Sequence, residues 1–143
     1  MKIVIDTNIV FSAILNVDSN ISKLILLSGS KYDFYSCEIL KAELDLHKSK
    51  ILKITGYSQQ HFHEINYLIT KNITFINHHL IGKKDLSNAN AVLENIDQKD
   101  APFYALAKHL KAKLCTGDKV LLKGLIAAGY KDTITTSKLL SHK

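Results

Sequence analysis

The sequence lacks arginine and tryptophan altogether, and it has one proline and six glycines in 143 residues. All nineteen residues counted as lysine or arginine are therefore lysines. Without arginine, the chain cannot supply an arginine finger or a bidentate guanidinium clamp to a phosphate. So few glycines and prolines exclude a collagen-like chain and favour long helices over turn-rich structure.

Cysteine and long apolar runs are also scarce. Cys37 and Cys115 lie far apart in the sequence and form no metal-spaced pair. The N-terminal run MKIVIDTNIVFSAIL is interrupted by Asp6 and Asn8 and lacks the features of a signal peptide. The sequence has no stretch of about 18 apolar residues, the length that a helix needs to cross a membrane. We therefore expect a cytoplasmic protein with reduced cysteines and no membrane partner, in which Cys115 packs as a small hydrophobic residue.

The chain does have the composition of one globular domain, which we expect to span residues 1–143. Hydrophobic residues make up 46% of the sequence and charged residues 22%, which excludes a disordered chain. The length leaves no room for a second independent core. The formal net charge of +6 makes the domain mildly basic.

Short apolar segments alternate with amphipathic ones along the chain. Strands are predicted at residues 2–5, 33–36, 73–76, 113–116 and 132–136. Helices are predicted at residues 7–16, 21–27, 38–55, 58–71, 89–96, 100–111 and 120–128, with a polar loop over 77–86. This alternation predicts an α/β fold, a three-layer α/β/α sandwich around a mostly parallel sheet of four to five strands.

Four acidic residues stand where this fold would bring them together. Asp6 ends the first strand, Asp118 follows the fourth, Asp100 begins the helix before the fourth, and Glu43 lies in the helix after the second. Ligands of such sheets bind at the carboxyl ends of the strands. Carboxylates gathered there repel one another, and their natural counter-charge is Mg²⁺ or Mn²⁺. Carboxylates with such an ion are suited to phosphodiester hydrolysis.

Each acid also has a purely structural interpretation. Asp6, Asp100 and Asp118 can each cap the N-terminus of a helix, and Glu43 can be a solvated residue on a helix face. Their joint placement at one sheet edge favours a site. A capping role and a metal-binding role are also compatible in one residue.

The segments that contain these acids resemble the motifs of PIN-domain nucleases. The opening Ile-Val-Ile-Asp-Thr-Asn resembles the start of that family. Residues 97–107 (DQKDAPFYALA) resemble its third acidic motif, and residues 116–119 (TGDK) resemble its fourth. The resemblance spans nearly the whole chain in the right order. It implies a parallel sheet with helices on both sides and a Mg²⁺- or Mn²⁺-dependent endoribonuclease site.

The resemblance also implies roles for individual residues and for partners. By motif, the catalytic and metal-binding acids are matched by Asp6, Glu43, Asp100 and Asp118, and the supporting positions by Thr7, Asn8, Asp97 and Thr116. The pattern around Glu43 is generic, so Glu38 is an alternative fourth acid. Many small members of the family are toxins neutralised by a cognate antitoxin, and many dimerise. An antitoxin protein and a second copy of the chain therefore join RNA as expected partners.

The lysines and histidines bear on how a substrate would be held. Lys119, next to Asp118, is the best single candidate for contacting a substrate phosphate, as a point charge. The other lysines either keep the surface solvated or steer RNA, and steering implies an RNA affinity that falls steeply with salt. The seven histidines show no metal-ligand spacing and match no motif position, so metal and carboxylates would activate the attacking water.

Other enzyme classes on a similar sheet fit the sequence less well. A phosphatase of the haloacid-dehalogenase type needs a second aspartate where this chain has Asn8. A receiver domain needs an acid paired with Asp6, and a dinucleotide-binding fold needs glycines in the first turn. The alternative function that stays open is a PIN-like domain that binds RNA or a protein without cutting.

Overall fold

Five strands form one sheet in a computed structural model of the chain, which describes residues 1–26, 31–94, 96 and 98–141. The strands are β1 (Lys2–Ile5), β2 (Asp33–Cys37), β3 (Ile73–Ile76), β4 (Lys113–Cys115) and β5 (Thr133–Ile134). Their order across the sheet is β3-β2-β1-β4-β5, and all neighbouring pairs are parallel. The predicted parallel sheet is confirmed, with five strands.

The central strand β1 is apolar because both faces of the sheet are covered. Its residues Ile3, Val4 and Ile5 are fully buried, as is typical of a strand between two helical layers. Ile5 is in register with Cys115 of β4, and its carbonyl accepts a hydrogen bond from the hydroxyl of Ser36 in β2 at 2.8 Å. The carboxyl ends of β1, β2 and β4 are thus held next to one another.

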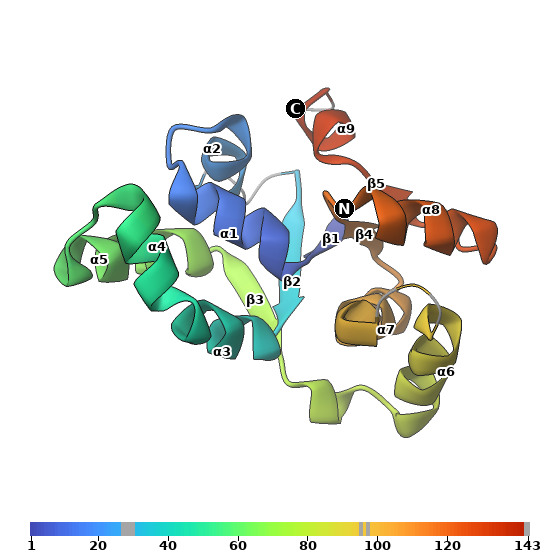
Figure 1. The fold of residues 1–143 in the computed structure, drawn as a ribbon. Coiled ribbons are helices and arrows are strands. Elements are labelled where there is room, and N and C mark those ends of the chain that lie inside the picture. The colour runs from blue at the N-terminus through green and yellow to red at the C-terminus, as the bar shows by residue number, and fades with distance from the viewer. Residues whose placement is uncertain (27–30, 95, 97, 142–143) are drawn as a thin grey trace.

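Helices cover the sheet on both sides. They are α1 (Thr7–Leu15), α2 (Asn20–Leu26), α3 (Ile39–Leu46), α4 (Lys48–Thr55), α5 (Gln59–Thr70), α6 (Lys83–Leu93), α7 (Ala101–Leu110), α8 (Lys119–Ala127) and α9 (Thr136–Ser141), with short 3₁₀ turns η1 (His78–Leu80) and η2 (Gln98–Asp100). Figure 1 shows α1 to α5 gathered on one side and α6 to α8 on the other. α7 packs on β1, β2 and β4, which confirms the predicted three layers.

The strand order reverses at β1, and this reversal determines where a ligand can bind. From β1 the chain proceeds outward through β2 to β3, then crosses to the other side to form β4 and β5. Connections that leave β1 and β4 in opposite directions open a crevice at their carboxyl ends. Asp6 follows β1 and Thr116 follows β4, so both lie at this crevice.

The helix predicted over 38–55 is instead two helices, α3 and α4, that meet at His47. His47 has a non-helical backbone (φ −98°, ψ 8°), and its ring lies edge-on to Phe11 of α1, 5.9 Å between ring centroids. The apolar periodicity continues through this junction, so the sequence pattern alone does not reveal the break. α4 then ends at Gly56, which adopts the left-handed conformation with φ 75°.

Two further segments differ from the sequence prediction. The segment 77–86, predicted as a loop, contains η1 and the start of α6, whose first turn carries the favourable acid Asp85. The last strand is only two residues long and is followed by α9, whose start is capped by the Thr135 hydroxyl accepting from the Lys138 N–H at 3.2 Å. The ends of the helices predicted over 21–27 and 89–96 reach residues outside the described part of the chain.

In the described part of the chain, no single helix is long and apolar enough to cross a membrane. α1 and α2 pass that test only as a pair, by length and composition, and they are bent by 103° relative to each other.

A candidate active site at the carboxyl edge of the sheet

Asp6 directly follows β1 and is almost completely buried, with 2% of its surface exposed. Its Oδ1 accepts a hydrogen bond from the N–H of Ile9 at 3.1 Å and thereby caps α1. Its Oδ2 accepts a hydrogen bond from the hydroxyl of Thr116 at 2.6 Å. Burial raises the pKa of Asp6, the hydrogen bonds from Thr116 and Ile9 oppose the rise, and the charges of Asp118 and Glu43 add to it. Asp6 therefore caps a helix, and its pKa is also raised by two other acids.

Thr116 joins the ends of β1 and β4. Besides donating to Asp6, its hydroxyl oxygen accepts a hydrogen bond from the N–H of Asp118 at 3.0 Å. The Oδ1 of Asp118 in turn accepts from the N–H groups of Val120 at 2.9 Å and Leu121 at 3.2 Å, which caps α8. This network fixes the positions of two acids that are more than a hundred residues apart in the sequence.

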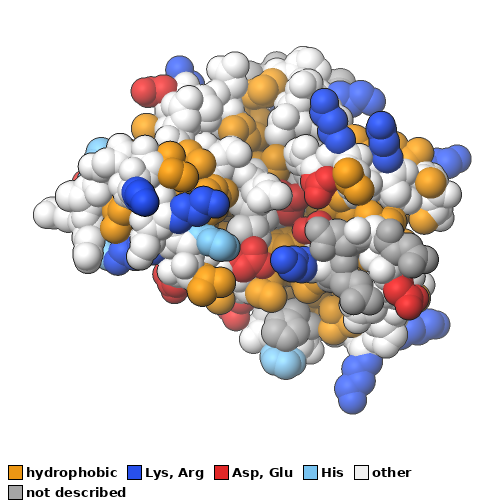
Figure 2. Space-filling view, viewed as in Figure 1, with side chains coloured by type: hydrophobic (Ala, Val, Ile, Leu, Met, Phe, Trp, Pro, Cys, Tyr) orange, Lys and Arg blue, Asp and Glu red, His pale blue; other side chains and the backbone are white. Residues whose placement is uncertain are grey.

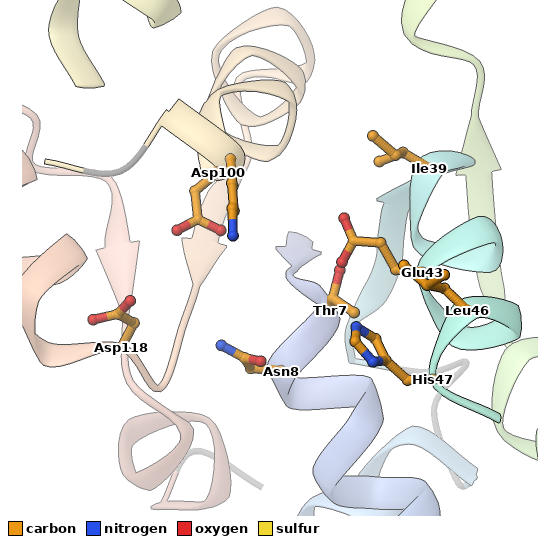
Figure 3. A pocket seen from close by; sticks show the side chains of 9 residues that line it. Thr7, Asn8, Ile39, Glu43, Leu46, His47, Asp100 and Asp118 are labelled. Carbon is orange, nitrogen blue, oxygen red and sulfur yellow. The ribbon is translucent and has the colours of Figure 1, made fainter. Parts of the chain in front are cut away.

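Three acids from different elements line one pocket of about 460 Å³, which we call the acidic pocket. They are Glu43 of α3, Asp100 at the start of α7, and Asp118 before α8. Figure 3 shows Glu43 on one side of the pocket and Asp100 and Asp118 on the other. Thr7 and Asn8, at the start of α1, lie between these two sides. The structure thus brings three of the four predicted acids around one space.

The other predicted residues occupy different places. Asp6 is not among the side chains that line the acidic pocket; it precedes Thr7 and is buried behind the lining. Glu38 is exposed at the N-cap position before α3 and does not line the pocket, so Glu43 is the glutamate that does. Lys119 lines a neighbouring pocket instead. Asp97 lies outside the described residues.

Four residues that the sequence analysis did not single out complete the lining. They are Ile39, Leu46, His47 and Lys99. The first three lie four residues before, three after and four after Glu43, so they follow from helical spacing once Glu43 is assigned to the site. The helical spacing from Glu43 is therefore the sequence signal that indicates these three residues. It gives the acidic pocket one wall that is apolar and imidazole-bearing, opposite Asp100 and Asp118 (Figure 3).

The donor set around the acidic pocket fits a hard divalent cation that keeps most of its water. The oxygen donors of the lining are carboxylates, the Asn8 amide and the Thr7 hydroxyl, whose oxygen is buried without a hydrogen-bond partner among the described residues; the His47 imidazole and the Lys99 ammonium group complete the polar lining. Within those residues, no three His, Cys, Asp or Glu side chains are close enough to hold a metal together. Few direct ligands, all oxygen, and room for water are what Mg²⁺ prefers.

Charge is unevenly distributed over this face of the molecule. Figure 2 shows acidic side chains in the middle of the face and lysines gathered at the upper right, over the region of α8 and α9. A cation in the acidic pocket would therefore sit within a surface that is basic overall, with a net charge of +6. Such a surface attracts anionic polymers.

Comparisons with known proteins agree with this fold. The sequence matches the PIN domain family over residues 4–139. No curated protein matches the sequence at a significant level. The crystal structure of VapBC2 from Rickettsia felis bound to a DNA fragment from their promoter has a similar chain, with a TM-score of 0.72 and 17% sequence identity. The similarity covers 94% of this chain and 98% of that chain, and at this identity it concerns the fold.

Proposed function

This chain belongs to the PIN domain family, and from that premise we propose that it is a Mg²⁺- or Mn²⁺-dependent endoribonuclease acting on single-stranded RNA. The observation that carries the proposal is the acidic pocket, where Glu43, Asp100 and Asp118 from three separate elements surround one space at the strand-order reversal. A fold needs no such convergence of like charges for stability. It is useful when a cation and a phosphate enter together.

Glu43, Asp100 and Asp118 are the residues that would hold the cation, in part through its bound waters, with Asn8 and Thr7 as oxygen donors to it or to its waters. When bound, the cation supplies a more acidic water and a counter-charge for the scissile phosphate. The rest of the machinery belongs to this chain. The carboxylates orient the attacking water and take its proton. As the water oxygen bonds to phosphorus, the P–O bond to the in-line leaving oxygen breaks, and that oxygen takes a proton from solvent.

Asp6 and Thr116 act mainly by positioning. Both carboxylate oxygens of Asp6 are engaged, one at the start of α1 and the other with the Thr116 hydroxyl. Because Thr116 also accepts from the N–H of Asp118, a change at Asp6 reaches an acid of the pocket through one intervening side chain. Partners of this kind typically matter by one to two orders of magnitude in metal affinity or activity.

The proposal also includes two protein partners, an antitoxin and a second copy of this chain. The similar Rickettsia felis structure is a complex, VapBC2, on a DNA fragment from its promoter. By analogy, we propose that this chain is the toxin of a toxin–antitoxin pair and that it is active in the cytoplasm. A small antitoxin reading frame beside the gene, and a complex of the two proteins that blocks cleavage, would support this part. A homodimer is tested by light scattering of the purified chain.

The proposal is tested by sequencing the 5′ ends of fragments made from single-stranded RNA by the purified protein with Mn²⁺. The wild type should cut RNA, not DNA of the same sequence, and should stop when EDTA is added. Asp118→Asn should be inactive, because it removes a pocket carboxylate while an amide oxygen can still cap α8.

The matched control is Asp33→Asn, which makes the same charge change at the amino end of β2, on the opposite edge of the sheet. It should cut like the wild type. Equal cleavage by Asp118→Asn and the wild type would contradict the site. RNA binding without cleavage under all metal conditions would favour the alternative of a non-catalytic RNA-binding domain.

A further inference from the structure

A second pocket, of about 240 Å³, lies beside the acidic pocket. We call it the hydroxyl pocket, and its lining consists of Thr116, Gly117, Asp118, Lys119, Leu122, Thr135, Thr136 and Ser137. Asp118 lines both pockets, so the two spaces meet at its side chain. The hydroxyl pocket is formed where the chain leaves β4 and where it leaves β5, at the same carboxyl edge of the sheet.

The side chains of this pocket are chemically unlike those of the acidic pocket. The acidic pocket has three carboxylates and one ammonium group, that of Lys99, whereas here there is one carboxylate, one ammonium group and a cluster of hydroxyls. The hydroxyl of Thr116 is already used by Asp6 and by the N–H of Asp118. The Thr135 oxygen accepts from the Lys138 N–H, which leaves its proton available to donate.

Two hydroxyls of the pocket, those of Thr136 and Ser137, make no hydrogen bond to any described residue. Lys119 is exposed beside them. The one carboxylate of the pocket, Asp118, has its Oδ1 occupied by the N–H groups at the start of α8. Besides the second carboxylate oxygen of Asp118, what lines the space is a lysine with serine and threonine hydroxyls. These are side chains that proteins use to bind the phosphates of nucleic acids.

We propose that the hydroxyl pocket binds the phosphate next to the scissile one in the RNA strand, with Lys119 as the cation and Thr136 and Ser137 as hydrogen-bond donors. This inference rests on the proposed function, because it takes the acidic pocket as the place of the scissile phosphate. It assigns Lys119 to a neighbouring phosphate, since this lysine does not line the acidic pocket. The strand would pass over Asp118, where the two pockets meet.

The test compares Lys119→Ala with Lys138→Ala in RNA binding. Lys138 lies on α9, one residue after Ser137, but it lines a different pocket with Lys31 and Lys113, at the amino edge of the sheet. The two variants therefore lose the same charge on neighbouring elements, and only one loses it from the hydroxyl pocket. Binding of a fluorescein-labelled single-stranded RNA is measured by anisotropy in EDTA over a range of salt concentrations.

For Lys119→Ala, we expect the slope of log affinity against log salt to become shallower by about 0.7, the value for one phosphate contact on a single strand. For Lys138→Ala, we expect the slope of the wild type. A second arm uses RNA with one neutral methylphosphonate beside the cleaved position. This change should weaken binding to the wild type more than binding to Lys119→Ala, because the variant has already lost the charge contact with that phosphate.

The double variant Thr136→Ala/Ser137→Ala serves as a second probe, with its thermal unfolding checked against the wild type. It should weaken binding at every salt concentration without changing the slope, because it removes donors and no charge. If the wild type cuts RNA and Lys119→Ala keeps the wild-type slope, the hydroxyl pocket is not a phosphate site. If the wild type neither binds nor cuts RNA, the proposed function itself fails.

Discussion

At the scale of one residue, the carboxylate of Asp6 contributes to the candidate site and lowers the stability of the folded protein when it is ionised. Its carboxylate is buried at the start of α1 between two donors, and two further acids lie near enough to raise its pKa after burial has done so. A buried carboxylate with like charges around it destabilises the folded protein when it is ionised. A cation entering the acidic pocket would relieve part of that cost.

The first prediction follows from the sign of this pKa shift. The folded state binds the Asp6 proton more tightly than the unfolded state, whose pKa is near the ordinary 3.8. As pH rises through 3.8 and then through the higher folded-state pKa, the wild type therefore loses stability. Asp6→Asn keeps an oxygen for the Ile9 N–H and does not titrate. Without divalent ions, we expect this variant to gain in stability relative to the wild type across that window, and then to keep the gain at neutral pH.

Urea unfolding over a series of pH values measures this difference. Asp33→Asn, with the same charge change at the other edge of the sheet, corrects for the altered net charge. A difference between Asp6→Asn and the wild type that stays constant with pH would show that Asp6 does not titrate differently in the two states.

The second prediction concerns the two cysteines, which the sequence correctly indicated as free and which are both buried. Burial raises the pKa of each thiol to about 12, with a smaller contribution from Glu43 at Cys37 and from Asp6 at Cys115. Only the thiolate is nucleophilic, so neither should react with iodoacetamide at pH 8 in the native protein. Mass spectrometry should find both alkylated in urea. Rapid native labelling of either would mean that its surroundings open.

At the scale of the element, helix ends are where local sequence signals are strongest. Asp6 before α1, Ser58 before α5 and Asp118 before α8 all accept hydrogen bonds from the first turn, as capping residues do. Two of these three caps also belong to the candidate site. A sequence rule that identifies helix caps therefore finds these acids. The same rule also gives them a purely structural explanation, in which they only cap helices.

The third prediction tests the cap of α4 at Gly56. This glycine has φ 75°, and its N–H donates to the carbonyl of Leu52 at 2.9 Å. No atom would touch an added Cβ within 4 Å, so Gly56→Ala meets only the backbone cost of the left-handed conformation, about 1–2 kcal/mol. We expect urea unfolding to show a loss of that size. Gly82→Ala, at another open position with φ −58°, is the control and should lose far less.

How far the sequence predicts the elements depends on whether the deciding interaction is local. The strands and their parallel arrangement follow from short apolar runs, because both faces of the sheet are buried. At the break, the His47 ring contacts Phe11, which is distant in the sequence, and periodicity does not reveal the break. The start of α9 carried a usable cap signal in Thr135, but the strand pattern before it obscured that signal.

How far the sequence predicts the candidate site also depends on whether the deciding contact is local. Glu43, Asp100 and Asp118 were predicted from strand ends and motifs, and the topology brings them to one pocket. The pairing of Asp6 with Thr116 is a contact between segments that are far apart in the sequence, so no local pattern contains it. That Lys119 lines a different pocket from Glu43 and Asp100 could only be learned from the arrangement of β4 and β5.

At the scale of the whole molecule, the charges are arranged for a polyanion. The chain has an excess of six positive charges, yet its central pocket is acidic. The fourth prediction is that single-stranded RNA binds with an affinity that falls steeply between 50 and 200 mM salt, since lysine contacts to phosphates release counterions. Anisotropy titrations measure it. An affinity that does not change with salt would mean that the lysines play no part in binding.

If carboxylates from separate elements share one divalent cation, that cation must stabilise the folded protein, and thermal unfolding with and without Mn²⁺ tests this most directly. At about one hundred times its dissociation constant, a bound ion adds about 2.7 kcal/mol of stability, or several degrees in Tm. The decisive pair is Glu43→Gln and Glu38→Gln, which remove the same charge from neighbouring positions, only one of them in the acidic pocket. We expect Mn²⁺ to stabilise the wild type and Glu38→Gln equally and to stabilise Glu43→Gln much less. Equal stabilisation of both variants, or none of the wild type, would contradict it.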